Sequence, residues 1–359
     1  MKKIFFTPGP SQLYSTVPAH IQTAVDDHIV EISHRGETYK QIFRNLTQNL
    51  KKLLDIPDSY SIFFAGSATE TMERVIENCV ETHSFHFVNG AFSKRFYTIA
   101  QELKKQPKKE EAKLGDGFDL EHIEIPKETE LICFTHNESA TGVMIPEKEI
   151  EGFKKRYPDM LLAVDIVSSA PYAAFDMRLL DFVFFSVQKG FGLPAGLGVM
   201  IVSPNALEKA ERLSKKGLNI GSYHNFVSLK SFADKDVTPE TPPVLHMYLL
   251  EKVIEDMLAI GVNTIREQTE TKAKLLYDFL DSFSPSAAFV KDKKFRSKTI
   301  IVADFGARIE VMKKQAREQG MIVGIGYDPF KETQIRIANM PSHSIEEIKL
   351  LIRILKESK

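Results

Sequence analysis

The sequence predicts an α/β protein with a large domain built on a mostly parallel sheet and a smaller C-terminal α+β domain. Short apolar runs rich in β-branched and aromatic residues recur as far as Val202, and helical patterns separate most of them. From Val244 the pattern is helical to Phe283, and further strand candidates follow. We place the domain boundary near Leu249, so that residues 1–248 form the large domain and residues 249–359 the small one.

Each strand candidate is short, apolar and bounded by turn residues. In the large domain the candidates are Ser61–Ala65, Phe85–Val88, Glu130–Phe134, Met160–Val164, Phe182–Val187 and Gly198–Val202. In the small domain they lie near Thr299–Ala303 and Gln334–Ile337. The Lys104–Glu111 run is charged with mixed sign, so we expect a solvated loop there rather than a binding patch.

Composition excludes several classes of function. The formal net charge is −1, from 47 basic and 48 acidic residues, which offers no electrostatic reason to expect nucleic acid or an anionic membrane as partner. The two cysteines, Cys79 and Cys133, suggest neither a disulfide framework nor a zinc site, and we expect no metal. No apolar run is long enough to span a bilayer, so the reducing cytoplasm is the expected location.

Asp165 and Lys189 are the most informative pair in the chain. Each directly follows an apolar run that reads as a buried strand. Ligands of open α/β sheets bind at the carboxyl ends of the strands. A lysine in such a place is costly unless it is paired, deprotonated or covalently used. Pyridoxal 5′-phosphate (PLP) chemistry needs an amine for a Schiff base and a carboxylate beside the pyridinium nitrogen.

Three other predicted strand-end loops fit the same cofactor, although each has an ordinary alternative. Gly66–Thr69 could hold a phosphate at a helix start, or could be a plain N-cap. Phe92 could stack on a planar ring, or could belong to the core. Thr135–Val143 gathers small polar residues, as either a site or a hydrogen-bonded turn. Taken singly, Asp165 could be an N-cap and Lys189 a surface residue, but chance is a poor explanation for all of them together.

A dinucleotide loop is the competing interpretation of Gly190–Gly196. The third glycine is one residue late, Pro194 interrupts the segment, and a strand rather than a helix follows. The dinucleotide fingerprint requires the helix, so we reject this interpretation.

With these motifs the chain resembles the class V, fold-type I PLP-dependent aminotransferases, and most of all their phosphoserine branch. The resemblance is carried by Thr7–Pro10, by the spacing of Asp165 and Lys189, by the Gln188–Lys189 pair and by Asn137–Ser139. It runs nearly end to end and implies the fold-type I architecture.

The resemblance also implies a role for each cofactor residue. Lys189 would form the Schiff base and move the proton, while Asp165 would keep the ring nitrogen protonated. Phe92 would stack on the ring and Ser139 would contact its phenolic oxygen. The phosphate would be held by Ser67, Ala68 and Gln188, and by Thr241 of a partner subunit in a homodimer with shared active sites.

For the substrate, the resemblance implies that His34 and Arg35 bind the distal group and that Arg336 grips the α-carboxylate. A His-Arg pair expected shortly before that arginine is absent, and Asp328 and Lys331 occupy the segment instead. Two substrate pairs therefore stay open. The first is L-glutamate/2-oxoglutarate with O-phospho-L-serine/3-phosphohydroxypyruvate, as in serine biosynthesis, by ping-pong kinetics. The second is alanine or serine with glyoxylate or pyruvate. A PLP-binding regulatory protein without turnover is the alternative outside enzymes.

Overall fold

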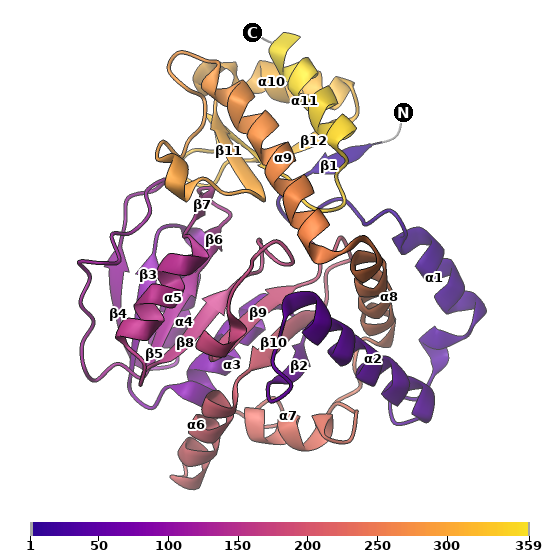
Figure 1. The fold of residues 1–359 in the computed structure, drawn as a ribbon, viewed down its shortest axis with the longest axis vertical. Helices are drawn as coiled ribbons and strands as arrows, with labels where there is room; N and C mark the ends of the chain where they lie inside the picture. Colours follow the sequence, from indigo (N-terminus) through magenta and orange to yellow (C-terminus); the bar gives the residue numbers. More distant parts are fainter. Residues whose placement is uncertain (1–2, 358–359) are drawn as a thin grey trace.

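A computed structural model describes residues 3–357 (Figure 1). Its larger sheet has seven strands, and the predicted α/β architecture with a mostly parallel sheet is confirmed. Across the sheet the order is β2 (Ser61–Ala65), β10 (Gly198–Val202), β9 (Phe182–Ser186), β8 (Leu161–Asp165), β5 (Leu131–Thr135), β3 (His83–Val88) and β4 (Gln106–Glu111). Only β10 runs antiparallel to its neighbours.

Helices cover both faces of this sheet. Successive strand side chains point to opposite sides, so each buried strand presents apolar side chains to both layers of helices. Phe63 and Phe184 pack on one face, whereas Phe64 and Phe185 pack on the other. The first face is covered by α3 (Ala68–Cys79), α4 (Ala91–Glu102), α6 (Pro204–Lys215) and α7 (Phe226–Ala233). The second is covered by α1 (Val17–Asp26), α2 (Glu37–Leu54), α5 (Glu147–Arg156) and α8 (Val244–Ile260).

A second, four-stranded sheet lies above the first in Figure 1. Its order is β1 (Ile4–Phe6), β12 (Met321–Ile325), β13 (Gln334–Ala338) and β11 (Ile300–Asp304). It packs against α9 (Val262–Asp281), α10 (Ile309–Glu318) and α11 (Ile345–Glu357). The N-terminal strand thus joins the sheet of the C-terminal region, by parallel pairing with β12. The boundary proposed near Leu249 falls inside α8 and stays a prediction.

Shorter elements complete the chain. A small antiparallel ribbon pairs β6 (Asn137–Glu138) with β7 (Val143–Met144). Turns of 3₁₀ helix lie at Ile29–Glu31, Met177–Leu179, Lys293–Phe295 and Gly306–Arg308. Between residues 3 and 357, the chain forms no helix that is long and apolar enough to cross a membrane.

The loop expected at Lys104–Glu111 is a correction. Most of this run forms β4, which pairs in parallel with β3 at the edge of the large sheet. Its side chains are mostly exposed, so they show no apolar pattern. Charged residues are a common protection of edge strands against further pairing, which explains how a polar run can be a strand.

Candidate active site

The predicted site residues meet at the carboxyl ends of the parallel strands β5, β8 and β9. Asp165 is the last residue of β8, and Lys189 follows β9 by three positions. Together with the start of α3 and the β5–β7 connection, they enclose a cavity of about 120 Å³. Its lining includes seven predicted cofactor residues: Ser67, Ala68, Phe92, Ser139, Asp165, Gln188 and Lys189.

Lys189 points its amine into this cavity. The side chain is 7% exposed, and its Nζ donates to Ser139 Oγ at 3.3 Å. The same Nζ lies 5.0 Å from the centre of the Phe92 ring. Burial lowers the pKa of Lys189 to about 8, although Asp165 and Glu138 oppose the shift. The amine is therefore much easier to deprotonate than an exposed lysine, as a nucleophilic or proton-moving amine requires.

The N-terminal segment lies against the alkyl chain of Lys189. A Cβ atom on Gly9 would stand 2.9 Å from Lys189 Cε, and the Ser11 amide donates to Gln188 O at 2.9 Å. The close approach explains why a glycine occupies position 9 of the Thr7–Pro10 motif. It also limits the positions that the Lys189 side chain can adopt.

Asp165 faces the cavity from the end of β8. It is 4% exposed, and its Oδ1 accepts from the Val167 amide at 2.8 Å. Burial raises the pKa of Asp165 to about 7, because the hydrogen bond and the attraction of Lys189 only partly offset desolvation. A cation placed beside this carboxylate would favour its ionised form.

The start of α3 forms the expected cup. Ser67 caps the helix, with its Oγ accepting from the Glu70 amide at 3.1 Å, as the N-cap alternative proposed. The N-cap is confirmed and phosphate binding stays a prediction; the two are compatible, because the first amides of a helix have no partner within the helix and can bind an anion. A Cβ on Gly198 would come within 2.8 Å of the Ser67 backbone, so β10 packs directly behind the cup.

Glu138 is a site residue that the sequence reading did not single out. It is fully buried, and its Oε2 accepts from the Phe92 amide at 3.0 Å and from the Ser93 amide and hydroxyl at 2.9 Å. Its Oε1 accepts from the Ala140 amide at 3.0 Å. One carboxylate thus joins the loop that carries Phe92 to the loop that carries Ser139. The approach requires a glycine at position 90, where a Cβ would meet Glu138 Cγ at 2.3 Å, but no local sequence pattern marks this contact.

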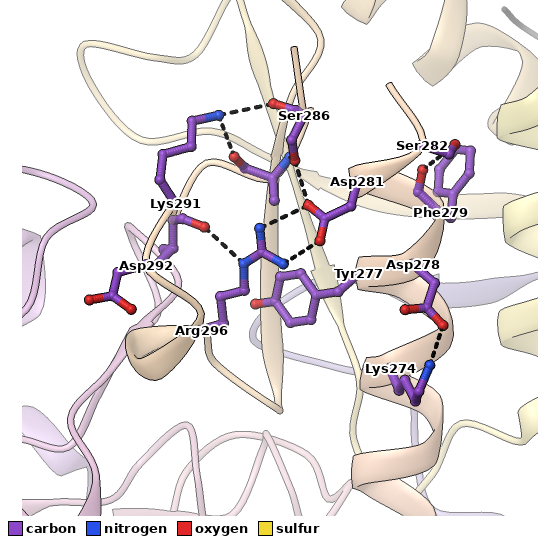
Figure 2. A network of polar contacts seen from close by, with 12 residues as sticks. Lys274, Tyr277, Asp278, Phe279, Asp281, Ser282, Ser286, Lys291, Asp292 and Arg296 are labelled. Atoms are coloured by element: carbon purple, nitrogen blue, oxygen red, sulfur yellow. Dashed lines mark hydrogen bonds and ion pairs between the residues drawn. The ribbon is translucent and has the colours of Figure 1, made fainter. Parts of the chain in front are cut away.

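The C-terminal region holds the Asn137–Ser139 loop from outside. Arg336 donates to Ser139 O at 3.0 Å, and Thr299 Oγ1 accepts from Asn137 Nδ2 at 3.0 Å. Arg336 thus touches the site without lining the cavity. Figure 2 shows what fixes the segment before Thr299: the guanidinium of Arg296 forms paired hydrogen bonds with Asp281, at 2.7 and 2.8 Å. Arg296 also lies over the Tyr277 ring.

Besides Arg336, three further predicted residues lie outside the cavity of a single chain. Thr241 and Arg35 are exposed, and His34 is half-buried. Their roles stay predictions. Lys331, which lies in the segment where the expected His-Arg pair is absent, pairs with Asp328 at 2.7 Å.

The residues present fit PLP. Among the described residues, three buried polar atoms that face this region have no hydrogen-bond partner: Asn137 Oδ1, Ser186 Oγ and Gln188 Oε1. Unpaired buried polar atoms are costly, so they indicate a polar ligand. This cofactor requires a buried amine, a buried carboxylate, an aromatic ring and the start of a helix, and the site supplies all four.

Comparisons with known proteins agree with the predicted family and fold. A sequence model of the class V aminotransferases matches residues 4–327. The crystal structure of a phosphoserine aminotransferase from Cytophaga hutchinsonii is 48% identical, with a TM-score of 0.96 over 99% of this chain and 98% of the other. A phosphoserine aminotransferase of Corynebacterium glutamicum is 27% identical over 96% of this chain and 92% of its own length. An alanine–glyoxylate aminotransferase from Nostoc shares the fold, with 20% identity and a TM-score of 0.79 over 100% and 95%.

Proposed function

Because the chain belongs to the class V aminotransferase family, we propose that it is a PLP-dependent phosphoserine aminotransferase. It would transfer an amino group between L-glutamate/2-oxoglutarate and O-phospho-L-serine/3-phosphohydroxypyruvate, by ping-pong kinetics. The observation that carries the proposal is the buried Lys189 amine, which shares one cavity with Asp165 and Phe92. The similarity to the phosphoserine aminotransferases selects the substrate pair.

Different residues of the chain would hold the cofactor, move the proton and bind the phosphate. Bound PLP supplies an electron-poor ring that stabilises negative charge at the substrate Cα. Lys189 would hold the cofactor covalently and, once released, would move the proton from the substrate Cα. Asp165 would keep a proton on the ring nitrogen, and Phe92 would fix the ring plane. The start of α3, with Ser67 and Ala68, would bind the phosphate.

We further propose a cytoplasmic homodimer with shared active sites. Thr241 would reach the phosphate in the partner subunit, and His34 with Arg35 would serve the distal group of the substrate. The exposure of Thr241 and Arg35 and the partial exposure of His34 in a single chain support this assignment, since a shared site needs residues on the outer surface of each subunit. Arg336 would bind the α-carboxylate, for which its planar fork is suited.

Single-turnover absorption spectra test the proposal. The purified protein, loaded with PLP, is mixed separately with phosphoserine, glutamate, alanine and serine, and the loss of the yellow aldehyde form is followed. We expect phosphoserine and glutamate to convert the cofactor to its amine form. Conversion by alanine or serine, with phosphoserine inert, would instead favour the glyoxylate or pyruvate alternative, and the pairing of Lys331 with Asp328 would explain it.

Borohydride reduction supplies the control for the cofactor itself. Reduction of the PLP-loaded protein should leave a stable adduct on Lys189, which peptide mass mapping locates. The K189A variant should form no adduct and show no turnover. Turnover near the wild-type level in K189A would overturn the assignment.

A further inference from the structure

We propose that His224 is a positioning residue for the cofactor phosphate, and that it acts as a cationic bridge between the start of α3 and the segment that carries Thr241. The inference rests on the proposed function and names a residue that the family motifs do not include. His224 does not lie at the end of a predicted strand, and the two carboxylates with which it pairs, those of Glu70 and Glu240, do not line the cavity. Its importance follows from the two carboxylates that it joins.

On one side the bridge supports the phosphate cup. Glu70, in the first turn of α3, accepts from the Gly66 amide through Oε2 at 2.8 Å. Its other oxygen, Oε1, makes a short hydrogen bond with His224 Nδ1. Gly66 directly precedes Ser67 and Ala68, so the Glu70 carboxylate sets the path of the backbone that would hold the phosphate. His224 in turn fixes the orientation of Glu70.

On the other side the bridge holds Glu240, the neighbour of Thr241. His224 Nε2 lies 3.2 Å from Glu240 Oε2 in an ion pair. Two carboxylates that share one imidazole repel each other and need compensation. The His224 cation supplies it. Thr238 Oγ1 also donates to Glu240 O at 2.7 Å, which fixes the backbone of the same segment.

Burial and charge make this bridge effective. The His224 side chain is 9% exposed, whereas those of Glu70 and Glu240 are 27% and 31% exposed. Burial alone would disfavour the imidazolium, but the neighbouring carboxylates of Glu240 and Glu70 raise the pKa of His224 to about 9. The residue is therefore cationic at neutral pH. Without it, two partly buried carboxylates would face each other beside the phosphate cup.

Titration of the apoenzyme with PLP tests the bridge, and the phosphorus NMR resonance of the bound cofactor reports on the cup directly. We expect H224A to raise the dissociation constant of PLP by about tenfold or more, as expected when one partner of a buried ionic network is removed. The second substitution E240N removes one of the repelling carboxylates. The double variant H224A/E240N should therefore recover an affinity close to that of E240N alone.

His20 provides the matched control. It also makes a partly buried contact with a carboxylate, since its Nε2 lies 2.8 Å from Asp256 Oδ2, but it is on α1 and away from the cavity. H20A should leave the PLP affinity and the phosphorus resonance unchanged. If H224A does not fold, H224Q carries the test, because glutamine keeps a hydrogen-bonding group at this position without the positive charge.

Two results would overturn the inference. The first is wild-type affinity for PLP in H224A or H224Q. The second is a double variant that binds as weakly as H224A, since a general packing defect would not be rescued by E240N. Either result would leave the proposed function intact if borohydride still traps PLP on Lys189 of the wild type. A wild-type protein that binds no PLP would overturn the proposed function and this inference together.

Discussion

Replacement of Asp165 by asparagine should stabilise the apoenzyme while it impairs the proposed reaction. Burial raises the pKa of Asp165 from its ordinary value of 3.8 to about 7. One pKa unit corresponds to about 1.4 kcal/mol, so above pH 7 the ionised carboxylate costs up to roughly 4 kcal/mol of folding free energy. Asparagine keeps the oxygen that accepts from the Val167 amide. Because Lys189 loses a favourable neighbour, we expect a net gain of about 2–3 kcal/mol.

The pH dependence identifies the cause. Between pH 3.8 and about 7 the folded wild type holds a proton on Asp165 that the unfolded chain has released. The wild type therefore loses stability as pH rises through this window, and D165N does not. The difference between the two should be small near the lower limit and should reach its full size above about pH 7.

Urea unfolding of PLP-free protein, followed by circular dichroism at several pH values, measures the difference. D181N is the control, because Asp181 is equally buried but pairs with Lys154 at 3.0 Å. Its substitution should lower the free energy of unfolding. If D165N is less stable than the wild type at about pH 8, or if the difference does not change with pH, the reasoning fails.

Three further outcomes are expected. In E138Q the carboxamide cannot accept from all four donors that surround Glu138, so PLP affinity should fall about tenfold in an absorbance titration. Unchanged affinity would contradict the role of Glu138 in joining the Phe92 and Ser139 loops. In R296M the Asp281 carboxylate loses its paired guanidinium, and urea unfolding should show a loss of roughly 2–4 kcal/mol. The rate at which PLP and borohydride label Lys189 in the apoenzyme should rise with pH to a midpoint near 8, and a midpoint near 10.5 would refute its lowered pKa.

The strands were predictable where burial imposes an apolar run. Ser61–Ala65 and Gly198–Val202 were predicted with the observed bounds, because turn residues flank continuous apolar segments that are buried on both faces of the sheet. Gln106–Glu111 was missed because an edge strand needs hydrogen bonds from one neighbour only and can stay charged. Pairing of Ile4–Phe6 with β12 could not be predicted, since it joins segments from opposite ends of the chain.

The centre of the site was predictable for a related reason. Residues that directly follow parallel strands must meet at one edge of the sheet, so Asp165 and Lys189 were placed together by topology alone. Glu138 and His224 act through contacts with residues far away in the sequence, and no local pattern marks such contacts. Both were therefore visible only in the structure.

Among the described residues that line the cavity, Lys189 is the only basic one, so recognition of the substrate phosphate needs charge from elsewhere. Arg336 already donates to Ile325 O at 2.7 Å and to Ser139 O at 3.0 Å, so its position near the cofactor loop is fixed by the backbone. Lys331 is neutralised locally by Asp328. The remaining cationic candidates, His34 and Arg35, lie outside the cavity of their own chain. If phosphoserine is the substrate, we therefore expect the charge that selects it to come from the partner subunit of the proposed homodimer. Substrate choice would then depend on the dimer interface, whereas attachment of PLP to Lys189 would not.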